Sequence, residues 1–231
     1  MKSYSQALKI LKQNKIEIND ENINSSESLN RVSSNNIYTN SNYPSANNAS
    51  FDGYAIKSKD TNKFHNKIYQ KFKIVGSIAA GDKPIKKKIK KFETVEIMTG
   101  ALIPKSFDTI IPIEQINFYP NKKKAKFILL NKKVSKFEHV RFKGSDYKKG
   151  DLLISKGTIL QPSHLLALKT LGIKKIKVKK KPNILFFSTG NEITNKDKIL
   201  DWEVRNSNCH YINSLSQNFL FNFNDGGVLR D

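Results

Sequence analysis

The spacing of apolar and polar positions changes twice along the chain and separates three regions. In the first region, residues 4–12 repeat apolar side chains at helical spacing, which predicts a short amphipathic helix. Residues 19–48 are rich in Asn and Ser but retain apolar anchors, so we expect an extended linker with a candidate helix at residues 27–32. The N-terminal region therefore predicts little regular structure beyond its first helix.

From residue 50 onward, short apolar segments alternate with Gly, Pro and Asn. Segments of this kind predict strands of ordinary length, and they lie at residues 72–76, 94–98, 109–113, 127–130 and 136–140. A turn at residues 119–122 predicts a hairpin. Strands at this spacing indicate a compact β-barrel or sandwich of about 100 residues.

The last third of the chain mixes strand and helix patterns. A helix over residues 162–172 precedes a strand at residues 173–178. Residues 184–187 are continuously apolar, which is typical of a strand buried on both faces. A helix near Asn208 and a parallel strand beginning at residues 228–229 follow. This order predicts the opening of a βαβ layer.

Composition favours a globular protein of the cytoplasm. The 231 residues contain 38% apolar and 26% charged side chains, which argues against collagen-like, disulfide-rich and fully disordered classes. The single cysteine, Cys209, has no partner for an internal disulfide. No apolar stretch approaches the ~20 residues of a membrane span, and the first ten residues lack the apolar core of a signal peptide.

The formal net charge of +21 raises the question of nucleic-acid binding. All but four of the 41 cationic residues are lysines; the arginines are Arg31, Arg141, Arg205 and Arg230. Readers of nucleic acid depend on arginine for bidentate and stacking contacts. Lys, Asn, Ile and Phe also share AT-rich codons, so codon bias accounts for the lysine excess. A solvated lysine-rich face is therefore favoured over a nucleic-acid groove.

Three segments each place an acidic or hydroxyl residue in a glycine-containing turn. They are NASFDGYA at residues 48–55, IMTGA at 97–101 and STGNE at 188–192. Each segment alone predicts only a turn. P-loop, dinucleotide-binding, zinc-protease and paired-cysteine signatures are absent from the sequence.

In this order the three segments resemble the molybdopterin molybdenumtransferase family, of the MoeA and gephyrin C-terminal domain type. Further matches are Arg141-x-x-Gly144-x-Asp146-x-x-x-Gly150, Asn208 near a helix start, and Asp231. The resemblance extends from about residue 28 to residue 231. Family members continue with a glycine-rich pterin-binding loop and a C-terminal β-domain, neither of which this sequence contains.

The resemblance implies an α/β multidomain fold. A mixed linker domain carries an inserted β-barrel-like domain and is followed by the start of a three-layer α/β molybdopterin-binding domain. The implied boundaries are an N-terminal helix at residues 1–23, a linker domain at 24–41 and 144–178, an inserted β-domain at 42–143, and a partial α/β domain at 181–231. The family also implies a homodimer whose site forms between the β-domain of one subunit and the α/β domain of the other.

The reaction implied by the resemblance inserts molybdate into adenylylated molybdopterin and releases AMP. Both substrates are anions, so carboxylates suit such a site only if they hold a cation, and the resemblance implies Mg²⁺. The family motifs then assign catalytic roles to Asp52, Thr99, Asp146 and Glu192. They assign substrate binding to Gly100, Ser188, Thr189, Gly190 and Asn208. Glu192 and Asp231 are the expected Mg²⁺ ligands.

Two other functions remain open on the sequence alone. The missing pterin-binding loop favours a non-catalytic binding or scaffolding module of the same fold, and the net charge leaves nucleic-acid binding as the weakest alternative. We also expect the 231-residue chain to be inactive alone. Residues after about 181 would then be loosely ordered, because the apolar faces of their strand and helix lack a covering layer.

Overall fold

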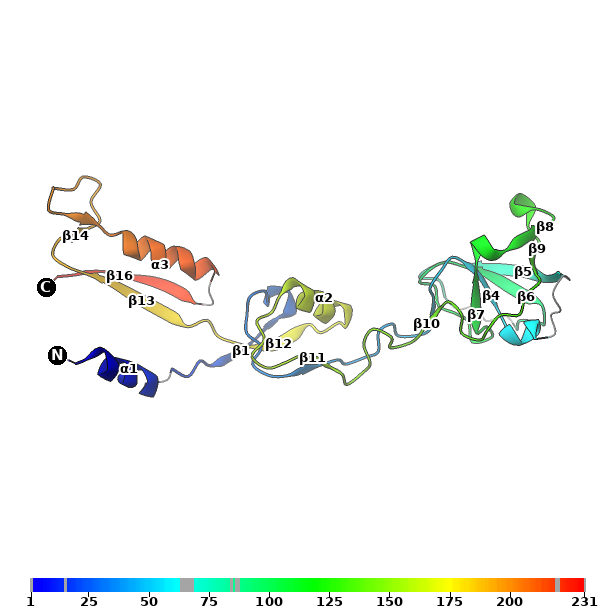
Figure 1. Cartoon of the computed structure of the whole chain (residues 1–231), viewed down its shortest axis with the longest axis horizontal. Helices are drawn as coiled ribbons and strands as arrows, with labels where there is room; N and C mark the ends of the chain where they lie inside the picture. Colours follow the sequence, from blue (N-terminus) through cyan, green and yellow to red (C-terminus); the bar gives the residue numbers. More distant parts are fainter. Residues whose placement is uncertain are drawn as a thin grey trace. The chain divides into compact units, whose positions relative to one another are not determined.

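The chain folds into two compact units, one of which interrupts the other. The computed structural model describes residues 2–14, 16–62, 69–83, 85, 88–218 and 221–230. The first unit comprises Met1–Tyr38 and Leu152–Asp231, and the inserted unit comprises Thr39–Asp151. In Figure 1 the inserted unit runs from light blue through cyan to green. The four-part division predicted from the family stays a prediction.

The inserted unit is built on a mixed six-stranded sheet. Its members are β4 (Gly53–Ile56), β5 (Gln70–Ile78), β6 (Glu93–Ile97), β7 (Thr109–Pro112), β8 (Asn117–Tyr119) and β9 (Phe127–Leu130). The strand order is β7-β4-β6-β5-β9-β8, and only the β5–β6 pair among these is parallel. Two short strands, β3 (Asn48–Ala49) and β10 (Val140–Arg141), form a separate antiparallel pair. Within the described residues the sheet is therefore open, with β7 and β8 as its edges, rather than a closed barrel.

Apolar side chains cover both faces of this sheet. Along β4 they alternate, so that Tyr54 and Ile56 enter one buried cluster while Ala55 enters the other. Phe72 of β5 and Ile128 of β9 lie in the first of these clusters and are fully buried. The central strands thus pack against apolar clusters on both faces, which fixes the positions of the turns at their ends.

The predicted strands of the inserted unit are confirmed except for one. The hairpin between β8 and β9 is also confirmed, with a cis peptide bond before Pro120 and a 3₁₀ turn at Lys122–Lys124. The predicted strand at residues 136–140 is wrong, because residues 136–139 form a turn. Phe137 and His139 have positive φ angles of 70° and 55°, which no strand accommodates.

Two antiparallel strand pairs and one helix make the core of the first unit. β1 (Asp20–Asn24) pairs with β12 (Lys175–Lys179), and β2 (Ile37–Tyr38) pairs with β11 (Leu152–Ile154). α2 (Pro162–Thr170) begins at a proline, which needs no N–H partner there. Its Leu168 is fully buried in the core cluster of this unit.

The predicted helix at residues 162–172 and the strand at 173–178 are confirmed within a few residues, but the helix at residues 27–32 is wrong. Only a 3₁₀ turn forms at Ser25–Glu27. Asn30 then takes a left-handed conformation with φ of 60°, which ends any helical path.

The C-terminal part of the first unit contains a parallel pair, β13 (Asn183–Thr189) and β16 (Asn222–Leu229), with α3 (Ser207–Asn218) between them in sequence. A second short parallel pair joins β14 (Ile193–Thr194) and β15 (Val204–Arg205). The predicted βαβ order is confirmed, but the start of the second strand is wrong, because β16 begins at Asn222 and ends, rather than begins, at residues 228–229. Burial of β13 on both faces is wrong, because Leu185 is 58% and Phe187 41% exposed.

The predicted N-terminal helix is confirmed as α1 (Tyr4–Gln13). Ser3 caps it, since its hydroxyl accepts a hydrogen bond from the backbone N–H of Gln6. No residue of α1 is buried. Across the described residues, no helix combines the length and the apolar character needed to cross a membrane.

Candidate functional site

Asp52 and Thr99 meet in the inserted unit although 46 residues separate them in sequence. Asp52 lies in the turn before β4, and Thr99 lies in the turn after β6. β4 and β6 are antiparallel neighbours with Gly53 opposite Ile97, so the two turns come together at one end of the sheet. The Oδ1 atom of Asp52 accepts hydrogen bonds from the backbone N–H of Thr99 at 2.7 Å and from its hydroxyl at 2.8 Å.

Glycines make this approach of backbones possible. A Cβ atom on Gly53 would lie 2.0 Å from the carbonyl oxygen of Ile111, so only glycine fits there. Gly100 has a φ of +80°, a conformation that strains other residues. Its carbonyl accepts a hydrogen bond from Nδ2 of Asn48 at 2.8 Å, and its N–H donates to the carbonyl of Ala49 at 2.9 Å. The two motif turns are therefore joined at several points.

The carboxyl group of Asp52 is held in its ionised form. The backbone N–H of Thr99, and after it the Thr99 hydroxyl, lower the pKa of Asp52 below its usual value. Asp52 is exposed, and its Oδ2 atom accepts no hydrogen bond from any described residue. A fixed, ionised carboxylate thus presents one oxygen to solvent.

Asp146 has other partners. Its Oδ2 atom pairs with Arg141, and its Oδ1 atom accepts a hydrogen bond from the hydroxyl of Ser145 at 3.0 Å. The Arg141 guanidinium is the main cause of the lowered pKa of Asp146. The structure therefore places Asp146 in an exposed ion pair of its own, without direct contact to Asp52 or Thr99.

The STGNE segment lies at the carboxyl end of β13, in the first unit. The hydroxyl of Ser188 donates to Oδ1 of Asn206 at 2.6 Å, and both residues are buried. This bond ties the end of β13 to the residue that precedes α3. Thr189 and Asn208 are exposed, with Asn208 in the first turn of α3. The carboxyl ends of parallel strands are where open α/β sheets bind ligands.

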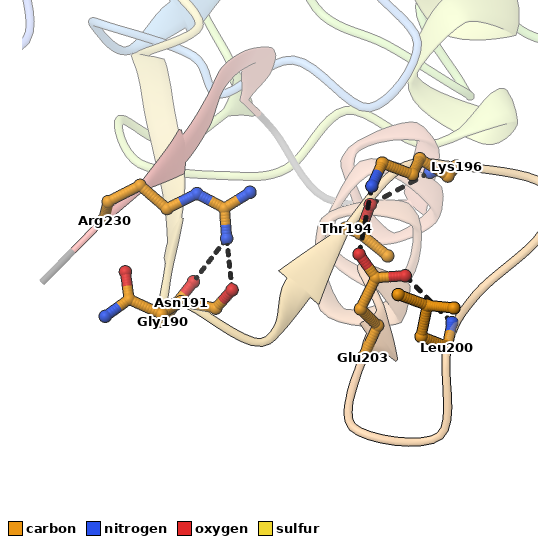
Figure 2. A network of polar contacts seen from close by, with 7 residues as sticks. All are labelled: Gly190, Asn191, Thr194, Lys196, Leu200, Glu203 and Arg230. Carbon is orange, nitrogen blue, oxygen red and sulfur yellow. Dashed lines mark hydrogen bonds and ion pairs between the residues drawn. The ribbon is translucent and has the colours of Figure 1, made fainter.

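Glu192 folds back over Gly190. A Cβ atom on Gly190 would lie 2.6 and 2.8 Å from the two carboxylate oxygens of Glu192, a flexible side chain that can move away. The φ of +140° at Gly190 is what favours glycine there. The guanidinium of Arg230 donates to the carbonyls of Gly190 and Asn191, as Figure 2 shows. The turn is therefore attached to the end of β16 as well as to β13. Asp231, the other expected Mg²⁺ ligand, lies outside the described residues.

Sequence reasoning missed Glu203, which organises the neighbouring loop. Its Oε2 atom accepts a hydrogen bond from the N–H of Leu200 at 2.9 Å, and its Oε1 atom pairs with Lys196 at 3.1 Å (Figure 2). The Leu200 N–H, followed by Lys196, lowers the pKa of Glu203. The signal was weak, since one acidic residue in a polar loop is ordinary. Arg230 and Asn206 were missed as partners because their contacts are set by strand pairing.

The described residues of one chain do not make up a Mg²⁺ site. Among them, no group of three or more His, Cys, Asp or Glu side chains lies close enough to hold a metal ion. Mg²⁺ requires several oxygen ligands in a near-octahedral arrangement. Glu192 alone does not satisfy that requirement, so we assign no chemical step to the ion.

Comparison with known proteins decides the family. Residues 2–172 match the family model described as the MoeA N-terminal region, domain I and II. The chain belongs to this family. The resemblance noted from the sequence motifs is thereby confirmed.

Relatives named molybdopterin molybdenumtransferase support the same assignment. The protein of Staphylococcus epidermidis is 28% identical over 218 residues, which cover 94% of this chain and 51% of the relative. That of Staphylococcus aureus strain N315 is 31% identical over 192 residues, covering 83% and 44%. The chain thus spans about half the length of the curated relatives it matches.

Solved MoeA structures share the fold. The molybdopterin biosynthesis MoeA protein from Pyrococcus horikoshii OT3 has a TM-score of 0.86 at 29% identity, covering 99% of this chain and 60% of that one. A second structure of the Pyrococcus protein has a TM-score of 0.84 at 30% identity, covering 98% and 57%. These likenesses support the expected α/β multidomain class in outline.

Proposed function

We propose that this chain acts in molybdenum cofactor biosynthesis as a molybdopterin molybdenumtransferase. The reaction inserts molybdate into adenylylated molybdopterin and releases AMP, and it takes place in a cytoplasmic homodimer. The observation that carries the proposal is the Asp52–Thr99 pair, in which two separate family motifs meet through hydrogen bonds of 2.7 and 2.8 Å. Membership of the MoeA family, together with relatives named molybdopterin molybdenumtransferase, supports the reaction class.

Asp52 is the residue best prepared for chemistry. The two bonds from Thr99 fix the orientation of the carboxylate and keep it ionised at neutral pH. Its Oδ2 atom, free of described donors, can accept a hydrogen bond from a water molecule or from a hydroxyl of the substrate and so orient it for reaction. Thr99 is in this proposal a positioning residue, because both of its donors are directed to Asp52.

The turn after β13 is proposed to hold the anionic substrate. Gly190 itself is buried with the Glu192 carboxylate over it, so the groups proposed to contact the substrate are the exposed side chains around this turn. Ser188 and Asn206 hold the end of the strand in place, and exposed Thr189 and Asn208 are available to donate hydrogen bonds. Asp146, paired with Arg141, fits a role in anchoring rather than in the chemical step.

The test measures AMP release from adenylylated molybdopterin in the presence of molybdate, with and without Mg²⁺. Two proteins are compared: the 231-residue chain, which we expect to be inactive, and this chain extended by the C-terminal portion of the Staphylococcus epidermidis relative. In the extended protein, Asp52→Asn should reduce turnover by about 100-fold, because the ionised acceptor that orients the reacting hydroxyl or water is lost.

A matched control is available in the same unit. Asp82 is also exposed, and it also accepts a hydrogen bond from a backbone N–H, that of Ala79 at 2.7 Å. Asp82→Asn should leave turnover unchanged. Full activity in Asp52→Asn would refute the site assignment. Substrate binding without turnover in the unmodified extended protein would instead favour a non-catalytic binding module.

A further inference from the structure

A cavity in the inserted unit lies beside the motif turns but does not include Asp52 or Thr99. Its volume is about 750 Å³, within the usual range for sites that bind small molecules. It is bounded by residues 45–47, residues 102–108 and the turn at Phe137. We call it the Phe137 pocket.

The walls of the Phe137 pocket are fixed by backbone hydrogen bonds. The N–H of Ile103 donates to the carbonyl of Asn47 at 3.0 Å, and the N–H of Phe137 donates to the carbonyl of Asp108 at 2.8 Å. Phe107 forms a buried part of the lining at 5% exposure, whereas Phe137 is 43% exposed. The pocket thus combines an apolar wall, which includes Phe107 and the accessible ring of Phe137, with polar and charged residues.

Phe137 is held in an unfavourable backbone conformation. Its φ of 70° is rare for a bulky residue and persists only where surrounding contacts enforce it. The N–H of Phe137 donates to the carbonyl of Asp108 and to the hydroxyl oxygen of Thr109, and these two bonds provide that enforcement. The structure therefore maintains the aromatic ring in the pocket wall at an energetic cost.

The charged residues that line the Phe137 pocket are predominantly cationic. Lys88, Lys105 and Lys143 are exposed, and within the described residues their ammonium groups form no ion pair. Asp108 is the single carboxylate in the lining, and its two oxygens already accept bonds from the N–H and the hydroxyl of Ser58. An anion entering the pocket would meet three uncompensated cations.

We propose that the Phe137 pocket binds a small organic anion with an aromatic body. The ring would pack against Phe137 and the apolar wall, where aromatic pairs contribute beyond simple burial. The acidic group would lie at the opening, among the three lysines. An inorganic anion would not bury the apolar wall. A neutral aromatic compound would gain no electrostatic attraction from the three lysines. This proposal is independent of the reaction proposed above.

The probes are an anion and its neutral counterpart. Anilinonaphthalene sulfonate carries both features, whereas phenylnaphthylamine has the same aromatic body without the acidic group. Binding of each to the 231-residue chain is followed by fluorescence. In the triple variant Lys88→Gln, Lys105→Gln, Lys143→Gln, the affinity for the sulfonate should fall by on the order of tenfold, while the affinity for the neutral amine should not change.

Two further variants separate charge from shape. The triple variant Lys122→Gln, Lys123→Gln, Lys124→Gln removes the same charge from a 3₁₀ turn outside the pocket and should retain sulfonate affinity. Phe137→Gly removes the ring while accepting the positive φ, so it should weaken binding of both probes.

Acetylation of lysines, measured by mass spectrometry, locates the bound sulfonate. Protection of Lys105 and Lys143, but not of the lysines in the 3₁₀ turn, supports the proposal. Equal loss of affinity in the two triple variants, unchanged affinity in the pocket variant, or lack of protection at Lys105 and Lys143 would each overturn it.

Discussion

The turn at Asp52 and the loop at Glu203 contain the same kind of hydrogen bond but differ in the structure that surrounds it. In each, an ionised carboxylate accepts a hydrogen bond from a backbone N–H, that of Thr99 or that of Leu200. Asp52 reaches across two turns of a six-stranded sheet with buried clusters on both faces. Glu203 bonds only within its own loop, three residues back to Leu200 and seven residues back to Lys196, and this loop follows the exposed strand β13. Similar hydrogen bonds therefore do not imply similar rigidity.

The largest difference should appear in limited proteolysis. Strand β13 has exposed Leu185 and Phe187 and one described partner strand, whereas β5, β6 and β9 lie within the sheet of the inserted unit. Segments with few buried apolar contacts open locally at low free energy. Cleavage after residue 181 should therefore be faster than cleavage within those three strands by on the order of tenfold or more.

Thermolysin digestion followed by mass spectrometry measures this difference, because the protease cuts beside the apolar residues that both units contain. A time course at two protease concentrations shows whether the cut sites lie in folded segments that open. Equal cleavage rates in the two regions would show that β13 is as well supported as the larger sheet.

Two glycine-to-alanine substitutions compare how tightly the inserted unit and the β13–β16 pair are packed. In Gly53→Ala the new Cβ meets the backbone carbonyl of Ile111 at 2.0 Å, and that strand cannot shift cheaply. We expect the free energy of unfolding to fall by ~3 kcal/mol. In Gly226→Ala the Cβ meets the ring of Phe187 at 2.4 Å, but this half-exposed ring can rotate away, so the expected loss is below ~1 kcal/mol.

Chemical denaturation of each variant gives these values. Gly76→Ala is the control, because its Cβ would lie 3.5 Å from a side-chain atom of Ile85, an ordinary contact. A loss in Gly226→Ala as large as that in Gly53→Ala would mean that Phe187 is fixed.

The smallest effects concern the two carboxylates themselves. Asp52→Asn and Glu203→Gln weaken the acceptors of the Thr99 and Leu200 amides, so hydrogen exchange at each amide should accelerate by about five- to tenfold. In Asp52→Asn the effect should remain at Thr99, whereas in Glu203→Gln it should spread over the loop that begins at Lys196. Amide exchange by NMR resolves the two patterns.

Acid should reproduce both changes in the unmodified protein. The pKa of each carboxyl group is lowered in the folded state, so each stabilises the fold above its unfolded pKa. That contribution is lost as pH falls through the lowered folded value. Exchange at Thr99 and Leu200, compared after correction for intrinsic rates, should rise below about pH 4. No such rise should occur in the two variants.

Strands that show a clear apolar pattern of their own were predictable, while turns and burial that depend on distant contacts were not. The hairpin between β8 and β9 follows from its own residues. The turn at residues 136–139 does not, because long-range bonds to Asp108 and Thr109 hold Phe137 at its positive φ. The exposure of Leu185 could not be predicted from the apolar segment that contains it, because burial depends on which other elements cover the strand.

The same limit applies to the site. The family resemblance indicated Asp52, Thr99 and Gly100, and the β4–β6 pairing explains why they meet. Asp146 came from the same resemblance, yet its pairing with Arg141 is a property of the folded turn. Glu203 had no motif to mark it, because its role lies in backbone contacts that any acidic residue in that loop could make.

The insertion of one unit into the other sets an order of events during synthesis. Asp20 of β1 pairs with Lys179 of β12, about 160 residues later. At about 5–20 residues per second, a ribosome needs roughly 8–30 s to supply that partner. Every strand of the inserted unit is made in the meantime, and the N–H of Thr39 can already donate to the carbonyl of Asp151. The inserted unit is therefore synthesised in full before the strand that pairs with β1 has been made.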